Sequence, residues 1–241
     1  MKHHESFSKI GGLLFDKDGT LFSYDTSWLV VNKELAMIAA RGDHTFAEKI
    51  LSACGMDLNT GSVIPDTLLA SGTINEIALA MIEAGSTVKF VDMIKAFKDV
   101  IVRSVYVSKQ ITNLKVFFSR LQQRGFLLGI ASNDSEDSII KTAEHFEFLE
   151  YLNYISGCDS GYGCKPDIGM ALGFCSATGL EPSQIAIIGD SNRDMDMAQS
   201  VGAGLKVAVL TGTGTHSSLS EKSDLCIKDI TVLEALLPSF I

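Results

Sequence analysis

Short runs of apolar residues, each bounded by glycine or by polar residues, recur along the chain. The first run covers residues 11–15 (GGLLF), and the same pattern returns at 127–131 (LLGIA) and 185–188 (IAII). Apolar runs of this length, with no polar alternation, are typical of strands buried on both faces of a parallel sheet. The remaining candidate strands are 207–210 (VAVL) and the weaker runs 154–156 and 225–227.

Helical patterns separate these runs. In residues 111–123 the apolar side chains of Leu114, Phe117, Phe118 and Leu121 follow helical spacing. Further helices are predicted at 135–145, 168–178 and 192–201. Strands that alternate with helices favour a parallel sheet covered on both faces. The sequence therefore predicts an α/β fold with a Rossmann-like core.

One segment interrupts this alternation. Between about residues 26 and 108 we find helical patterns and no convincing strand. The predicted helices are 28–40, 45–54, 74–83 and 90–107. We therefore expect a core domain made of residues 1–22 and 109–241, with an all-helical domain, residues 23–108, inserted after the first strand.

Composition and charge narrow the class of protein. Hydrophobic residues make up 46% of the 241 residues, enough to bury a sizeable core. The net charge of -9 makes nucleic acid and anionic membranes poor partners, and it also serves solubility. No stretch is apolar for long enough to span a membrane, and the polar segment 1–9 is unlike a signal peptide. A cytoplasmic location is expected.

The cysteines are odd in number and form no C-x-x-C pair. The five are Cys54, Cys158, Cys164, Cys175 and Cys226. This spacing argues against a disulfide framework and against a structural zinc site. Buried, reduced thiols are expected, as in a reducing compartment.

Polar clusters directly follow three of the apolar runs. They begin at Asp16, Ser132 and Gly189, and a fourth pair, Lys165-Pro166, lies about 10 residues after the weak strand at 154. Each alone could be a turn, a helix cap or a surface lysine. In an open parallel sheet, however, groups at the carboxyl ends of strands face one crevice. We therefore expect these clusters to meet in space.

Residues of these types suit the hydrolysis of a phosphate monoester. A carboxylate such as Asp16 can attack phosphorus, provided that the negative charges are neutralised. Asp16 and Asp190 offer oxygen ligands for Mg²⁺, and Lys165 offers a fixed positive charge. Ser132 and nearby backbone N–H groups could hold phosphoryl oxygens.

The clusters resemble the four motifs of the haloacid dehalogenase superfamily. The stretches LFDKDGTL, IASND, Lys165-Pro166 and IIGDSNRD stand in that family's order and span most of the chain outside the insert. The overall pattern is similar to that of phosphoglycolate phosphatase-like members. The resemblance implies a Mg²⁺-dependent phosphatase that acts on a small phosphorylated metabolite, of the phosphoglycolate or sugar-phosphate type, through an aspartyl-phosphate.

The resemblance also implies a role for each matching residue. Asp16 is the nucleophile and a metal ligand, Asp18 is the general acid and base and binds metal through its main-chain carbonyl, and Lys165 steadies the nucleophile and the phosphate. Asp190 and its companion Asp194 bind the metal. Ser132, with Asn133 beside it, binds phosphate, and Gly19 and Thr20 of the first motif are further candidates for substrate binding.

Three features bear on the substrate. A protonated Asp18 helps only an oxygen leaving group, which favours phosphate esters over carbon–halogen chemistry. In this family, helices inserted after the first strand form a cap that opens and closes on hinges, here expected near 23–26 and 104–108. The chain lacks the Asp-Ser pair that many relatives carry after D-G-T-L, and reads Ser23 to Trp28 (SYDTSW) instead. Phosphoglycolate itself is therefore in doubt.

Some residues have two readings. Trp28 lines the cleft under the cap or packs in a core, and the latter is commoner for a lone Trp. The cap residues Lys89, Lys95, Lys98 and Arg103 either meet a substrate carboxylate or form a solvated helix face. Arg193 and Asp196 are expected to face solvent.

Three other functions remain open. A phosphomutase of the β-phosphoglucomutase type would use the same Asp16 and Asp18, but would retain the phosphate. A phosphonate hydrolase would need a cap lysine near the nucleophile. A non-catalytic phosphate-binding module would be free to lose Asp18. The oligomeric state and the metabolite itself are not encoded in any pattern that we find.

Overall fold

The structure is a computed structural model, and it describes residue 7 and residues 9–237. The prediction that the polar segment 1–9 is not a signal peptide concerns residues that lie mostly outside the described part of the chain. In the part of the chain that is described, no helix combines the length and the apolar character needed to cross a lipid bilayer.

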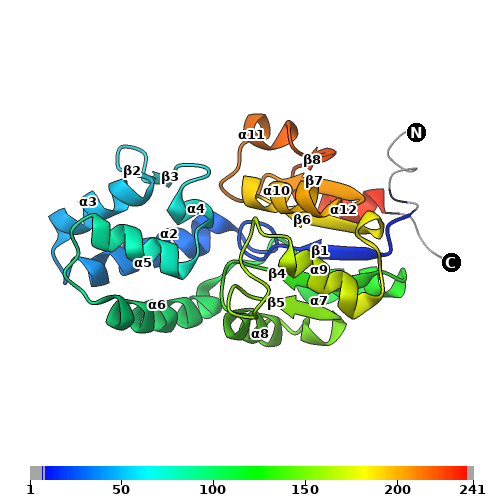
Figure 1. Cartoon of the computed structure of the whole chain (residues 1–241), viewed down its shortest axis with the longest axis horizontal. Coiled ribbons are helices and arrows are strands. Elements are labelled where there is room, and N and C mark those ends of the chain that lie inside the picture. Colours follow the sequence, from blue (N-terminus) through cyan, green and yellow to red (C-terminus); the bar gives the residue numbers. More distant parts are fainter. Residues whose placement is uncertain (1–6, 8, 238–241) are drawn as a thin grey trace.

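The described residues form a sheet of six parallel strands at the centre of the larger half of the molecule (Figure 1). The strands lie in the order β5-β4-β1-β6-β7-β8, so the first strand of the chain is near the middle. Their bounds are β1 Gly12–Phe15, β4 Leu127–Ala131, β5 Tyr154–Ser156, β6 Ile185–Gly189, β7 Leu205–Val209 and β8 Leu225–Ile227.

Helices cover both faces of the sheet. Along β1, Leu13 and Phe15 belong to one buried cluster and Leu14 to another, because alternate side chains point to opposite faces. The first face carries α7 (Leu114–Gln123), α8 (Glu136–His145) and α12 (Ile230–Leu236). The second carries α9 (Gly169–Thr178), α10 (Asn192–Val201) and α11 (His216–Ser220). Phe15 packs edge-on against Phe118, with ring centroids 5.5 Å apart.

The predicted α/β fold with a Rossmann-like sheet is confirmed. The predicted runs 127–131, 154–156 and 225–227 coincide with observed strands, and the helix 192–201 has its predicted bounds. Ser135 caps α8 by accepting a hydrogen bond from the Ser138 N–H, as its position at the helix start suggested.

A second set of helices forms what we call the helical module, residues 24–107. It contains α2 (Tyr24–Ala39), α3 (His44–Cys54), α4 (Leu68–Ser71), α5 (Ile74–Glu83), α6 (Phe90–Ser104) and the 3-10 helix η1 (Val105–Val107). These helices pack around a cluster of buried side chains separate from those of the sheet, with Leu35, Ile50 and Phe97 fully enclosed. The module faces the edge of the sheet from which β1 leads into α2 (Figure 1).

The expectation that the insert is entirely helical is wrong in one place. Strands β2 (Met56–Asp57) and β3 (Ser62–Val63) pair antiparallel between α3 and α4. Gly55 ends α3 with a φ of 113°, a conformation that glycine adopts without steric cost. Two-residue strands are too short to leave an alternating pattern in the sequence.

The expectation that all five cysteines are reduced is also wrong. Cys158 and Cys164 form a disulfide in the loop after β5, with Cα atoms 4.8 Å apart. The sequence could not predict this pairing, because it depends on the path of the loop between two cysteines that are six positions apart. Cys54 and Cys175 are buried free thiols, as expected, and Cys226 is free but only partly buried.

Two adjacent connections join the module to the sheet. The Ser23 N–H donates to the carbonyl oxygen of Lys109 at 2.9 Å, and Phe22 forms an antiparallel bridge with Gln110. The chain therefore leaves the sheet and returns to it at the same place.

Candidate active site

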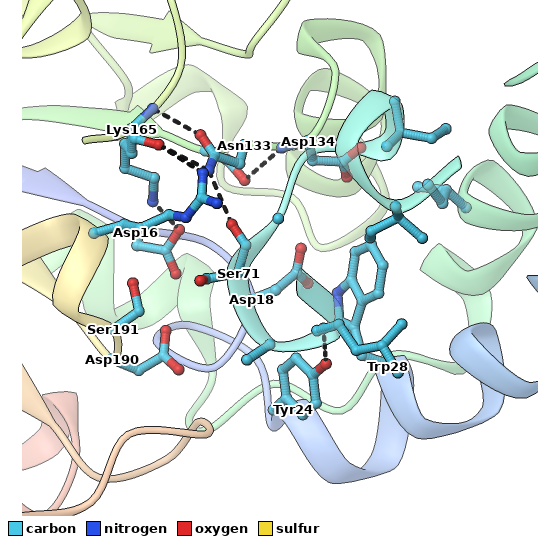
Figure 2. Close-up of a pocket in the computed structure, with 18 residues that line it drawn as sticks. Asp16, Asp18, Tyr24, Trp28, Ser71, Asn133, Asp134, Lys165, Asp190 and Ser191 are labelled. Atoms are coloured by element: carbon cyan, nitrogen blue, oxygen red, sulfur yellow. Dashed lines mark hydrogen bonds and ion pairs between the residues drawn. The ribbon is translucent and has the colours of Figure 1, made fainter. Parts of the chain in front are cut away.

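The carboxyl edge of the sheet and the helical module enclose a cavity of about 60 Å³ (Figure 2). Loops after β1, β4, β5 and β6 supply its sheet side, which confirms that the polar clusters of the sequence converge. Residues lining the sheet side are Asp16, Asp18, Ser132, Asn133, Asp134, Lys165, Asp190, Ser191 and Arg193. Residues lining the module side are Tyr24, Trp28, Leu69, Ala70, Ser71, Gly72, Ile74, Ile77 and Ile101.

Lys165 joins two carboxylates at the bottom of this cavity. Its Nζ atom lies 2.5 Å from Asp16 Oδ1 and 2.7 Å from Asp194 Oδ1. All three side chains are less than one-tenth exposed. Burial alone would lower the pKa of Lys165, but the two carboxylates and their hydrogen bonds raise it, so the ammonium stays charged.

Asp190 approaches the same group from the loop after β6. One oxygen of its carboxyl, Oδ2, accepts a hydrogen bond from the Thr213 N–H at 3.0 Å. Gly212 makes this approach possible, because a Cβ atom there would lie 1.7 Å from Asp190 Oδ2. Gly212 and Thr213 follow β7 and lie outside the four motifs, so the motifs alone give no sign of their role.

Three carboxylates thus gather around one ammonium. Ligand atoms of Asp16, Asp190 and Asp194 all lie within 4.8 Å of one another, and all three residues are buried. Desolvation by burial is the largest influence on Asp16 and raises its pKa to about 7, against the opposing effect of Lys165. The pKa of Asp190 is also raised, first by burial and then by Asp16 and Asp194.

This arrangement fits a divalent cation. Asp16 Oδ2 is buried and has no hydrogen-bond partner among the described residues, although a buried carboxylate oxygen normally has one. Three carboxylates against one ammonium leave negative charge uncompensated, and hard divalent cations prefer oxygen ligands. The residues present therefore fit the metal that the motifs implied.

Asp18 belongs to a second charged group beside the first. Lys17 Nζ lies 2.6 Å from Asp18 Oδ2 and 3.0 Å from Asp134 Oδ2, and Lys17 is 5% exposed. Burial alone would lower the pKa of Lys17, but the two carboxylates have the larger combined effect and raise it above its usual value. The ion pairs therefore persist. Asp18 therefore reaches the cavity with its carboxylate anchored. Lys17 and Asp134 were not predicted as site residues, because a lysine between two motif aspartates gives no sign of the direction in which it points.

Ser132 and Asn133 also reach the cavity, but the amide of Asn133 is already engaged. Asn133 Oδ1 accepts from the Lys165 N–H at 2.8 Å, and Asn133 Nδ2 donates to the carbonyl oxygen of Ser71 at 3.0 Å. Asn133 thus connects the backbone of Lys165 to helix α4 of the module. Ser132 is buried, and its hydroxyl accepts the Asp134 N–H at 3.2 Å.

Gly19 and Thr20, expected to bind substrate, do not line the cavity. Gly19 has a φ of 84° and passes so close to Asp190 that a Cβ atom would lie 2.6 Å from its carboxyl group. Thr20 is fully buried. Both residues lie in the turn after β1, and their role in substrate binding stays a prediction.

The expectation that Arg193 faces solvent is wrong. Arg193 lines the cavity and donates to both carboxylate oxygens of Glu76 at 3.1 and 3.2 Å, and also to the carbonyl oxygen of Lys165 at 3.1 Å. The apolar pattern of α10 leaves Arg193 outside the core of the sheet. That pattern cannot reveal a partner from another element, and Glu76 belongs to the helical module. Asp196 does face solvent, where it pairs with Lys222.

Among the module residues with two readings, Trp28 satisfies both, because it lines the cavity and also packs against the hydrophobic cluster of the module. It stacks on Tyr24 with ring centroids 6.5 Å apart (Figure 2). The cations at 89, 95, 98 and 103 are exposed and none of them lines the cavity, so they form a solvated helix face. A phosphonate hydrolase loses support for the same reason, since none of the described lining residues is a module lysine.

Comparison with known proteins agrees with this geometry. The sequence model of the family described as "Haloacid dehalogenase-like hydrolase" matches residues 13–210. A phosphoglycolate phosphatase of Pasteurella multocida is 26% identical over 91% of this chain and 96% of its own length. One from Chromobacterium violaceum is 27% identical over 46% of this chain, a match that spans about half of that relative (48%).

A solved structure has the same fold. The crystal structure of a "predicted phosphoglycolate phosphatase" from Haemophilus somnus 129PT superposes with a TM-score of 0.71, covering 95% of this chain and 98% of that one. The two share 17% sequence identity, so this likeness concerns the fold.

Proposed function

The chain belongs to the haloacid dehalogenase-like hydrolases and resembles their phosphoglycolate phosphatases, and we propose that it is a magnesium-dependent phosphatase of a small phosphorylated metabolite. The observation that carries this proposal is the buried group of Asp16, Asp190 and Asp194, closed on one side by Lys165. The retention of Asp18 at the cavity supports phosphate esters, whose leaving oxygen needs a proton.

Asp16, Asp190 and Asp194 would hold the Mg²⁺ ion, together with the main-chain carbonyl of Asp18. When bound, the ion supplies positive charge that neutralises the carboxylates and the phosphoryl oxygens. The unpartnered Asp16 Oδ2 supports this assignment. Binding also displaces protons, because a carboxyl with a raised pKa must be deprotonated to serve as a ligand.

The proposed reaction has two steps. A carboxylate oxygen of Asp16 bonds to phosphorus, the ester P–O bond breaks, and the leaving oxygen takes a proton from the Asp18 carboxyl. A water molecule then attacks phosphorus and gives a proton to Asp18, and the bond between Asp16 and phosphorus breaks to release phosphate. Lys165 holds the Asp16 carboxylate in place, and its charge offsets the approach of one anion to another.

We assign the helical module, with the expected boundaries 23 and 108, as a cap that excludes water from this chemistry. Asn133 supports this role because its amide joins the loop after β4 to Ser71 of the module. The ion-pair hydrogen bonds between Arg193 and Glu76 cross the same boundary. Water exclusion strengthens the charge interactions at the reacting group.

The test measures phosphate release from phenyl phosphate by the full chain, with added Mg²⁺ and with EDTA. We expect Mg²⁺-dependent, stoichiometric release, and a loss of at least about 1000-fold in Asp16→Asn. The control is Asp196→Asn. Asp196 lies on the same helix as Asp194, but its carboxylate is exposed and pairs with Lys222, so this substitution should leave activity unchanged.

Turnover that survives Asp16→Asn would exclude the proposed nucleophile. Stoichiometric release of free phosphate would exclude the phosphomutase, which retains the phosphate. Binding of phosphate without any turnover would indicate the non-catalytic module.

A further inference from the structure

The module side of the cavity is mainly apolar, and Ser71 and Tyr24 bring the hydroxyl groups among its lining residues. Leu69, Ile74, Ile77 and Ile101 line it, together with the ring of Trp28. The hydroxyl of Tyr24, the next ring along, is buried and already donates to the carbonyl oxygen of Leu69. The part of a substrate beyond its phosphoryl group would therefore meet mainly carbon atoms and aromatic rings on this side, and no charged group of the module.

The cations that line the cavity are committed to carboxylates of the protein. They are Lys165 and Arg193, and both come from the sheet side. Lys165 bridges Asp16 and Asp194, and faces the place where the phosphoryl group would react. Arg193 has both terminal nitrogens on Glu76. In the described part of the chain the module adds no cation to the lining.

A second negative charge on the substrate would thus enter an apolar region without a partner. Such a charge loses its hydration and gains no compensating ion pair, which disfavours its binding. An uncharged group of the same shape would lose little hydration and gain contact with the apolar wall. Esters with an uncharged leaving group should therefore be turned over with a much higher kcat/KM than esters with a charged one.

We infer that the substrate is a phosphate monoester of an uncharged, compact and largely apolar alcohol, and that carboxylate-bearing esters such as phosphoglycolate are poor substrates. This inference rests on the proposed phosphatase function and specifies what that function acts on. Trp28 and Ile74 are then specificity-determining residues, through contact with the alcohol part.

The test compares two esters of nearly equal shape on the full chain with Mg²⁺. Isobutyl phosphate and phosphoglycolate both release a primary alcohol, and differ in replacing two methyl groups by two carboxylate oxygens. We expect kcat/KM for isobutyl phosphate to exceed that for phosphoglycolate by at least about tenfold. An equal or higher kcat/KM for phosphoglycolate would overturn the inference and leave the proposed function standing. Phosphate release from neither ester, nor from phenyl phosphate, would overturn both.

A charge-matched pair of variants locates the selectivity. Ile74→Lys places an ammonium on the wall and should raise the ratio of phosphoglycolate to isobutyl phosphate turnover by about tenfold. Leu79→Lys places the same charge on the same helix, at a side chain 51% exposed and outside the cavity, and should leave the ratio unchanged. Equal ratios in the two variants would contradict the assigned wall. The comparison of esters on the unaltered chain decides the inference whether or not Ile74→Lys folds.

Discussion

Arg193 and Glu76 are held together by two parallel hydrogen bonds, Nη1 to Oε2 and Nη2 to Oε1, across the boundary between sheet and helical module. Glu76 also accepts the Thr73 N–H at 2.7 Å, so it caps helix α5 while it binds Arg193. Arg193 in turn holds the carbonyl oxygen of Lys165. One guanidinium therefore connects the start of a module helix with the backbone of the lysine that holds Asp16.

Substitution of Arg193 should weaken both connections. We expect Arg193→Leu to lower kcat/KM for phenyl phosphate by about tenfold, and Glu76→Gln by roughly two- to five-fold, because the latter keeps the bond to Lys165 and its carboxylate is partly exposed. Arg103→Leu is the control, since it breaks an exposed pair with Glu34 inside the module. Three variants of equal activity would show that the contact does not hold the site closed.

A methyl group at Gly212 should damage the metal site. The Cβ atom of Gly212→Ala would lie 1.7 Å from Asp190 Oδ2, so the carboxylate must move. We expect the Mg²⁺ concentration for half-maximal activity to rise at least about tenfold, and the thermal stabilisation by Mg²⁺ to shrink. Gly11→Ala is the matched control, because its Cβ would meet only the tip of the Leu180 side chain. An unchanged Mg²⁺ requirement in Gly212→Ala would remove Asp190 from the metal site.

Metal removal should change how stability depends on pH. The folded protein holds a proton on Asp16 up to a pKa of about 7, whereas the unfolded chain releases it near 3.8. Between these values the folded state binds more protons, so the free energy of unfolding of the metal-free protein falls as the pH rises from about 4 to about 7. Thermal unfolding in EDTA measures this slope, which Asp16→Asn should reduce.

The same experiment with Mg²⁺ should give the opposite trend. Because the ion displaces protons from carboxyl ligands, its stabilising effect should be larger at pH 8 than at pH 5. A stabilisation independent of pH would contradict binding at Asp16 and its buried neighbours.

The disulfide makes a prediction about thiol chemistry. Alkylation of the denatured, non-reduced protein should modify three of the five cysteines, leaving Cys158 and Cys164 unlabelled. The double variant Cys158→Ser, Cys164→Ser should lower the free energy of unfolding by about 2 kcal/mol, the loop-closure value for so short a loop. Cys226→Ser, a free thiol elsewhere, is the control. Labelling of all five cysteines would refute the bridge.

The sequence predicted the sheet and the meeting of the motifs for a clear physical reason. Strands β1, β4 and β6 are short and wholly apolar because both faces are covered, and polar residues can follow only where the strands end. That rule alone brings Asp16, Ser132 and Asp190 to one edge. Periodicity also located α2, α3, α5 and α6 of the module, whose buried stripes are regular, but it missed the single turn of α4.

The sequence could not predict which partner a side chain finds across space. Arg193 contacts Glu76, 117 positions away, and Lys17 selects Asp18 and Asp134, which no local pattern encodes. The disulfide and the hairpin of β2 and β3 depend on loop paths set by tertiary packing. The wall of the cavity is likewise assembled from separate helices, so its apolar character appears only in three dimensions.

The adjacent crossings at Ser23 and Lys109 have an evolutionary consequence. The two connecting segments are joined by the hydrogen bond from the Ser23 N–H to the Lys109 carbonyl oxygen, at 2.9 Å. The residues between them can therefore be lengthened, shortened or exchanged without moving any β-strand of the sheet. A foreign segment whose ends lie equally close could be transplanted there by recombination. New substrate specificities would then arise by exchange of the helical module, while the reacting residues at the edge of the sheet stay unchanged.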